Sequence, residues 1–173
     1  MEKELLLLGL LRKQKMHGYR LMEFIDSNLH ICTDLKKPTA YYLLEKMEGL
    51  GWVIQHEDSN GNRPAKRVYE ITDLGETIFQ STLRSHLEKF EPPFFSNDTV
   101  YIFWDSIPEI ERINLLQKKK SIIKNEMKNL EKIPEHFGGT QILLDHRLYF
   151  LKSEQEWVEK LILKLQTNKI KQS

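Results

Sequence analysis

The chain has 173 residues, of which 40% are hydrophobic and 29% charged, and its Lys and Arg (26) nearly balance its Asp and Glu (25). This length and composition exclude a disordered tail, a fibrous protein and a large multi-domain enzyme. The net charge of +1 gives no evidence for a polyanionic partner. Residues 1–75 alone carry 11 basic and 11 acidic side chains and are neutral overall. Only the placement of the charges can therefore indicate a partner.

No segment of the sequence is typical of a membrane span or a signal peptide. The apolar run of residues 5–11 is far shorter than the ~20 residues that cross a bilayer. Basic residues follow it, where a signal peptide would have a longer apolar core and a cleavage site. The single cysteine, Cys32, cannot form an internal disulfide. We expect a cytoplasmic protein without membrane contact.

The first 51 residues predict three short helices. Residues 4–14 are apolar on most sides, which is typical of a buried helix. After a turn at residues 17–19, a second helix places four apolar residues at helical spacing: Leu21, Met22, Ile25 and Leu29. A third begins near Pro38 and ends at Gly49 and Gly51, and its expected buried stripe is Leu43, Leu44, Met47 and Leu50.

A hairpin and a fourth helix follow. Residues 52–57 and 66–72 are β-prone and enclose a turn-rich stretch with Asn60-Gly61. Thr72 is a candidate N-cap for a helix whose expected inward residues are Ile78, Phe79, Leu83, Leu87 and Phe90. The predicted order is three helices, a hairpin and a helix.

Two prolines, Pro92 and Pro93, predict a boundary between a domain of residues 1–91 and a helical domain of residues 98–167. In the second domain a helix is expected over residues 108–132, with an apolar stripe of Ile110, Ile113, Leu116, Ile123, Met127 and Leu130. The last helix is expected over residues 141–166, with Leu144, Leu148, Leu151, Trp157, Leu161 and Leu165, before a frayed end. The fold class is mainly α (α+β).

Three helices followed by a two-stranded wing predict a winged helix-turn-helix, a fold that lays its third helix in the major groove of DNA. Subtracting the expected core stripe leaves a set of candidate DNA contacts on or just before this helix: Lys36, Lys37, Thr39, Tyr42, Lys46 and, in part, Tyr41. The two lysines precede the helix end that favours phosphate. Solvated surface charge is the alternative interpretation of these lysines.

The tip of the predicted wing is basic. Arg63, Lys66 and Arg67 lie within five positions, and Pro64 stiffens the segment. Arg63 and Lys66 are the preferred phosphate contacts. Because side chains alternate along a strand, only one of Lys66 and Arg67 is expected to share the DNA-facing side with Arg63, and the sequence leaves open which one.

A succession of motifs resembles the PadR-like family of bacterial transcriptional regulators. The resemblance is close over residues 4 to about 80 and loose beyond residue 100. Tyr42 departs from the family pattern, which often has proline there. The motifs, in chain order, are Leu8-Gly9-Leu10-Leu11, His17-Gly18-Tyr19, Thr39-Ala40-Tyr41-Tyr42-Leu43-Leu44, Leu50-Gly51-Trp52-Val53, Arg63-Pro64-Ala65-Lys66-Arg67-Val68-Tyr69 and Ile71-Thr72-Asp73-Leu74-Gly75.

This resemblance implies a homodimer that binds a two-fold operator in double-stranded DNA and represses, with release by a small molecule or another signal. The residues support the dimer independently, because a helix of about 25 residues with a continuous apolar stripe needs more cover than one short partner gives. Aromatic residues of the second domain are candidates for effector contact or dimer packing: Trp104, Tyr149 and Trp157.

Other functions have little support in the sequence. It contains no nucleotide-binding loop, dinucleotide fingerprint or hydrolase motif, and we expect neither an enzyme nor a metal or cofactor. The alternative is a helical protein-interaction module that uses the winged helix without sequence-specific DNA binding. That alternative leaves the basic wing and the outward Thr39 and Tyr42 unexplained.

Overall fold

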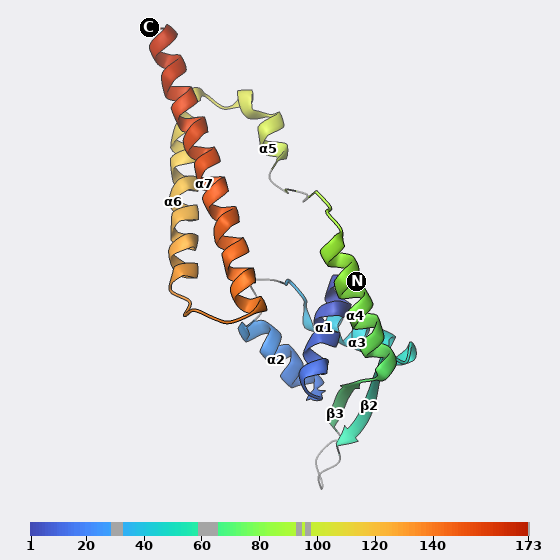
Figure 1. The fold of residues 1–173 in the computed structure, drawn as a ribbon. Coiled ribbons are helices and arrows are strands. Elements are labelled where there is room, and N and C mark those ends of the chain that lie inside the picture. Colours follow the sequence, from blue (N-terminus) through green and yellow to red (C-terminus); the bar gives the residue numbers. More distant parts are fainter. Residues whose placement is uncertain (29–32, 59–65, 93–94, 96–97, 173) are drawn as a thin grey trace. The chain divides into compact units, whose positions relative to one another are not determined.

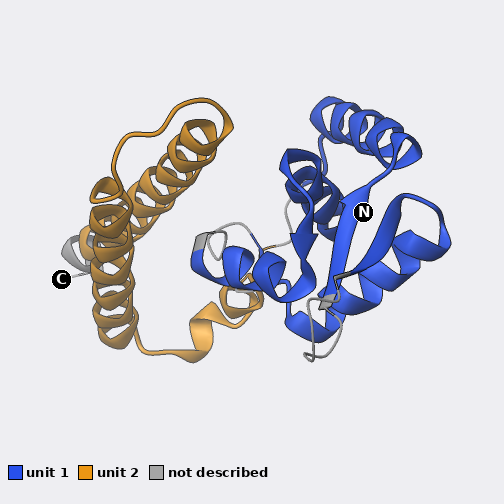
Figure 2. Ribbon diagram, turned by 90° about the horizontal axis from the view of Figure 1, so that it is seen from below, with its two compact units in different colours: residues 1–93 blue, residues 94–173 orange. Residues whose placement is uncertain are grey.

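The computed structural model describes residues 1–28, 33–58, 66–92, 95 and 98–172, with residues 28, 58, 66 and 168–172 described by their backbone alone. The chain forms two compact units, residues 1–93 and 94–173 (Figure 2). Its strands all belong to one small sheet in the first unit, so the molecule is mainly helical, as predicted.

The first unit follows the winged-helix order. Helices α1 (Glu2–Lys13), α2 (Gly18–Asn28) and α3 (Lys37–Gly49) precede strands β2 (Val53–Asp58) and β3 (Lys66–Ile71), and α4 (Asp73–Glu88) closes the unit. Strands β2 and β3 form an antiparallel hairpin that projects from the helical part (Figure 1). The predicted winged helix is confirmed.

Strand β1 (Met16–His17) was not predicted from the sequence. It pairs antiparallel with β3, with Met16 opposite Tyr69 and His17 opposite Val68, and gives a three-stranded sheet in the order β1-β3-β2. Two residues are too short to show the alternation by which a strand is recognised. The strand ties the turn before α2 to the wing.

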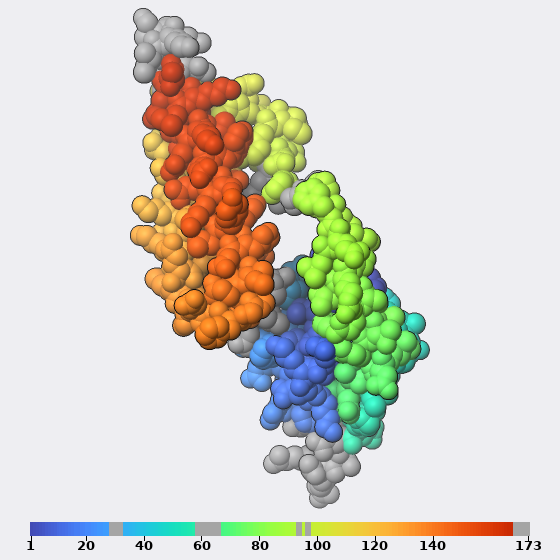
Figure 3. Space-filling model, in the orientation of Figure 1, coloured from blue at the N-terminus to red at the C-terminus, as the bar shows by residue number. Residues whose placement is uncertain are grey.

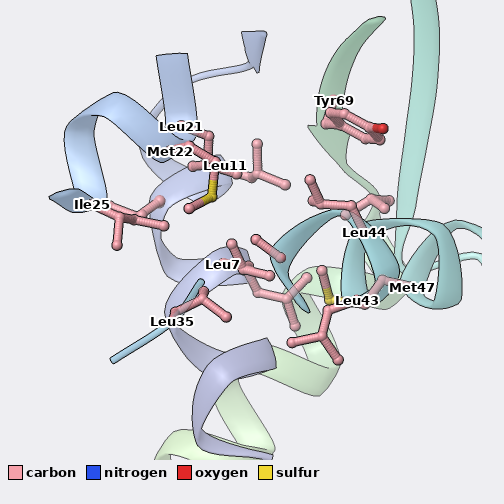
Figure 4. Close-up of a cluster of buried hydrophobic side chains, with 14 residues drawn as sticks. Leu7, Leu11, Leu21, Met22, Ile25, Leu35, Leu43, Leu44, Met47 and Tyr69 are labelled. Carbon is pink, nitrogen blue, oxygen red and sulfur yellow. The ribbon is translucent and has the colours of Figure 1, made fainter. Parts of the chain in front are cut away.

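One apolar core joins these elements (Figure 4). Leu7 and Leu11 of α1, Leu21 of α2 and Leu44 of α3 are fully or almost fully buried. Tyr69 of β3 is also fully buried and brings the sheet into the cluster. The buried stripe of α3 consists of Ala40, Leu43, Leu44 and Met47. This core fixes α3 against α1, α2 and the sheet.

The predicted inward face was wrong at the ends of two helices. Leu50 was expected in the α3 stripe but is half exposed, because it is the C-cap residue and the chain turns away from the core there. Leu87 and Phe90 were expected inside and are exposed, because the last turn of α4 extends past the core and Phe90 lies beyond the end of the helix at Glu88. Helical spacing predicts the direction in which a side chain points. It does not predict how much of the helix another element covers.

The junction between the wing and α4 is built around Thr72 and Gly75. The Thr72 hydroxyl accepts a hydrogen bond from the Gly75 N–H at 3.0 Å, which confirms Thr72 as the N-cap. The same hydroxyl donates to the Gly51 carbonyl at 2.7 Å. A Cβ at Gly75 would lie 2.0 Å from the Trp52 carbonyl oxygen. The start of α4 therefore requires a residue without a side chain.

The second unit contains α5 (Thr99–Ile102), a 3₁₀ turn η1 (Trp104–Ser106), and the long helices α6 (Glu109–Glu131) and α7 (Gly139–Gln172). Helices α6 and α7 lie side by side (Figure 1). Their contact buries Ile113, Leu116 and Ile123 of α6 with Val158 and Leu165 of α7.

Several details of the second unit differ from the sequence prediction. Ile110 and Trp157 were expected in the apolar stripes but are largely exposed, and Val158 is the buried residue beside Trp157. Helix α7 continues to Gln172, where fraying was expected. The elements α5 and η1 were missed because each spans a single turn. No helix among the described residues has the length and apolar character needed to cross a membrane.

Replacing Gly75 should destabilise the first unit. In Gly75→Ala the new methyl group collides with the Trp52 carbonyl, which cannot move without breaking the hydrogen bonds it accepts from the Thr72 N–H at 3.0 Å and the Thr72 hydroxyl at 3.1 Å. We therefore expect a loss of about 1–3 kcal/mol in the free energy of unfolding. The matched control is Gly49→Ala, because nothing lies within 4 Å of a Cβ at that helical position. Urea denaturation of the full chain measures both variants, and equal midpoints would contradict this account of the junction.

Candidate nucleic-acid interface

The outward surface of α3 begins with exposed residues at its N-terminus. Lys36 is the N-cap, and Lys37, Pro38 and Thr39 form the first turn, all exposed. The first N–H groups of a helix have no acceptor within the helix and favour an anion. Lys36, Lys37 and these N–H groups therefore form a small surface suited to phosphate.

The two tyrosines of α3 are placed differently. Tyr42 is 65% exposed and lies on the side opposite the buried stripe. Tyr41 packs against the core, and a Cβ at Gly18 would lie 2.7 Å from its ring. Both were predicted as DNA contacts, and the structure presents Tyr42 freely while it holds Tyr41 against the start of α2. Gly18 is needed at this position because it leaves room for the Tyr41 ring.

Lys46 is turned toward α1. Its Nζ lies 3.1 Å from Oε1 of Glu4, a carboxylate whose residue is only 7% exposed. Burial by itself would raise the pKa of Glu4, but hydrogen bonds from its own backbone N–H and from Lys46 hold that pKa below its ordinary value. An ion pair with a buried partner has a structural role, so Lys46 is a weaker candidate for DNA contact than the sequence indicated.

The structure describes only part of the predicted wing surface. Arg63 lies outside the described residues. Lys66 is the first residue of β3 and pairs with Asp58, but its side chain is not among those described. Arg67 is exposed, and its guanidinium lies 3.6 Å from Oε1 of Glu45 on α3. Of the wing cations, Arg67 therefore lies beside the outward face of α3.

Glu45 was not among the residues predicted from the sequence to contact DNA. Its position, three residues after Tyr42 and away from Ala40 and Leu44, follows from helical spacing. It was omitted because an acidic side chain does not suggest contact with a polyanion. The structure nevertheless places it on the outward face of α3, with its side chain 63% exposed.

The aromatic candidates of the second unit separate into three places. Trp157 lines an open cavity of about 840 Å³ with Phe95, Tyr101 and Phe150. Trp104 lines a smaller cavity of about 320 Å³ and lies under the guanidinium of Arg112, 5.1 Å from the ring centre. Tyr149 is 75% exposed on α7. The three were predicted as one group. In the structure, Trp104 and Trp157 line two cavities that share Tyr101 and Lys119, and Tyr149 lies on the exposed side of α7.

A charged pair that the sequence analysis missed also lines the larger cavity. The Lys119 ammonium donates to the Tyr101 hydroxyl at 2.9 Å and forms an ion pair with Glu154. Burial by itself would lower the pKa of Lys119, but Glu154 and Tyr101 raise it above its ordinary value. The cavity therefore combines aromatic rings with a fixed ammonium–carboxylate pair.

Residues 7–81 match the family model described as "Transcriptional regulator PadR-like family". The matched residues, which span most of the winged-helix unit, are similar to this family of transcriptional regulators. The resemblance inferred from the motifs is thereby confirmed. No curated protein matches the chain.

Solved structures share the fold of this chain over nearly its whole length. Bacillus subtilis PadR in complex with operator DNA has a TM-score of 0.80 at 22% identity, covering 94% of this chain and 98% of that one. The same protein in complex with p-coumaric acid has a TM-score of 0.76 at 19% identity, covering 94% of each chain. The PadR-like transcriptional regulator BC1756 from Bacillus cereus has a TM-score of 0.68 at 17% identity, covering 96% and 99%.

The Glu4–Lys46 pair should make stability depend on pH. Because the pKa of folded Glu4 lies below its ordinary value, the carboxylate stabilises the fold above the unfolded pKa of about 4.3, and this contribution is lost as the pH falls through the folded pKa. We expect Glu4→Gln to unfold at lower urea concentration than the unaltered protein at pH 7, and the difference to shrink below pH 4. Glu2→Gln, on an exposed residue of the same helix, is the control. A difference that is constant with pH would contradict the assignment.

Proposed function

We propose that this PadR-like regulator is a sequence-specific DNA-binding protein that acts as a dimeric repressor on a two-fold operator and is released by a small molecule. The main support for the proposal is the outward face of α3. Lys36 and Lys37 lie at its N-terminus, Tyr42 is exposed on it, and Arg67 of the wing lies beside it. The similarity to Bacillus subtilis PadR solved with operator DNA supports it at the level of the fold.

Helix α7 supports the proposed dimer. Opposite its buried residues, the helix carries a second apolar stripe, in which Ile142 is 70% and Tyr149 75% exposed, and Phe150 and Trp157 continue the same side. The spacing of seven or eight residues keeps all four on one side over about 22 Å. Figure 3 shows side chains of α7, coloured orange to red, on the surface of its unit. Exposed apolar surface of this extent is typical of an interface.

Two copies would present two recognition helices to one face of the DNA. In a two-fold dimer the same patch lies on both subunits, so the α7 stripes can cover each other. The half-sites of such an operator are about 34 Å apart, which is one turn of the duplex. The proposed operator is therefore palindromic.

The cavity beside α7 supports release by a small molecule. Phe95, Tyr101, Phe150 and Trp157 offer stacking surfaces, and the Lys119–Glu154 pair offers polar contacts. Binding sites for small molecules typically combine an apolar lining with a few fixed polar groups. Bacillus subtilis PadR has been solved with p-coumaric acid, which places a small-molecule ligand on a protein of the same fold.

Binding to DNA is measured first with the fragment immediately upstream of the coding region, at two salt concentrations and with unrelated DNA as competitor. Tight binding that resists the competitor is the expected result. Weak binding to every fragment that disappears with salt is non-specific, and would favour the protein-interaction module. The same assay then screens aromatic small molecules for release.

Lys37→Ala should weaken binding to all sequences, because a phosphate contact carries no base information. The slope of log affinity against log salt should fall by about one unit. The same outcome is expected for Arg63→Ala. Lys128→Ala, which removes an exposed cation from α6, is the matched control and should leave affinity and slope unchanged. An unaltered slope in Lys37→Ala would remove Lys37 from the proposed interface.

Tyr149→Glu should dissociate the dimer, because a carboxylate in the centre of an apolar interface loses its hydration without gaining a partner. The full chain, analysed by sedimentation equilibrium, should shift from dimer to monomer and bind the operator more weakly. Lys152→Glu adds a carboxylate to an exposed position of the same helix outside the stripe and should remain dimeric. A dimeric Tyr149→Glu protein would place the interface elsewhere.

A further inference from the structure

The outward face of α3 is not cationic at its centre. In the middle of α3 the residues on the side opposite the buried stripe are Tyr42 and Glu45, and both are more than half exposed. Lys46, the cation next to them in sequence, is turned toward α1 by its ion pair with Glu4. A helix proposed to enter the major groove therefore presents a carboxylate where a basic residue would be expected.

The surroundings of Glu45 compensate its charge locally. Arg67 reaches across from β3 to within 3.6 Å of the Glu45 carboxylate, and the two side chains are 57% and 63% exposed. An ion pair this exposed contributes at most about 1 kcal/mol to stability. In this pair the carboxylate lies toward the wing side of α3, and the guanidinium offsets its repulsion from phosphates.

A carboxylate can only accept hydrogen bonds, and few groups in the major groove donate. Cytosine N4 and adenine N6 are the donors on the base edges, and adenine N7, an acceptor, lies beside N6 and repels a carboxylate. Guanine presents only acceptors there. Cytosine is therefore the base that an outward Glu on a recognition helix fits.

We propose that Glu45 is a specificity-determining residue that accepts a hydrogen bond from cytosine N4 in each half-site, and that Arg67 is the positioning residue that orients it. This inference rests on the proposed function, in which α3 lies in the major groove. It adds the identity of one base pair and the residue that reads it.

The test is selection of bound duplexes from a random-sequence pool by the full-length protein and its variants. The unaltered protein should enrich a palindromic motif that contains a C·G pair at one fixed position of each half-site. Glu45→Gln keeps the size and an acceptor oxygen but adds a donor, a combination that suits adenine. It should lower the preference for C·G at that position by roughly five- to a hundredfold and shift it toward A·T.

Two further variants separate base reading from a structural role. Arg67→Met should weaken the preference at the same position and leave the rest of the motif unchanged. Glu48→Gln makes the same chemical change three residues further along α3, on an exposed side chain that lies off the Tyr42–Glu45 face, and should enrich the original motif. All variants change exposed side chains, so their thermal midpoints should match that of the unaltered protein.

The results separate failure of this inference from failure of the proposed function. If the unaltered protein enriches a motif and Glu45→Gln enriches the same one, Glu45 reads no base and the inference is overturned while the function stands. If the unaltered protein enriches no motif, sequence-specific binding is overturned and the inference falls with it. A loss of preference confined to the C·G position supports both.

Discussion

The burial of one stripe of α3 determines the functional surface of the first unit. Ala40, Leu44 and Met47 are fully buried and Leu43 nearly so, and a helix that buries one stripe must direct the opposite one to solvent. That constraint exposes Tyr42 and Glu45 and leaves Tyr41 and Lys46 at the flanks, where each finds a partner within the protein. The outward residues of α3 are thus selected by the core beneath them.

Two sets of contacts position the wing relative to this helix. At the base of the hairpin, Thr72 bonds to Gly51 and caps α4, so the turn after α3 and the start of α4 are joined through one hydroxyl. Along β3, Tyr69 is buried in the core while Arg67 reaches Glu45. Arg67 and Tyr69 are two residues apart and so lie on the same face of β3, where Tyr69 packs in the core and Arg67, nearer the tip, reaches Glu45.

The second unit follows the same principle with longer helices. One side of α7 packs on α6 through Val158 and Leu165, and the opposite side carries the exposed Ile142 and Tyr149. A two-helix layer can bury only one stripe of each helix. The remaining stripe is available to a second copy, and the cavity lined by Trp157 lies next to it on the same helix.

Much of the fold followed from the sequence because it depends on local patterns. The three helices, the hairpin, the Thr72 cap and the long C-terminal helices are encoded by spacing, turn residues and capping residues within a few positions of one another. The family resemblance rested on the same local motifs. Candidates at the first turn of α3, such as Lys37 and Thr39, needed only the start of that helix to be located correctly.

Only the tertiary structure determines which side chains of those elements have a partner within the protein. Nothing near Lys46 in the sequence indicates that Glu4 lies beside it, 42 residues away, and nothing near Glu45 indicates Arg67. Likewise, Leu87 and Phe90 have the spacing of buried residues but extend beyond the element that would cover them, and Val158 is buried where Trp157 was expected to be. Periodicity determines the direction of a side chain on its own helix, whereas burial and charge pairing depend on which distant element packs there.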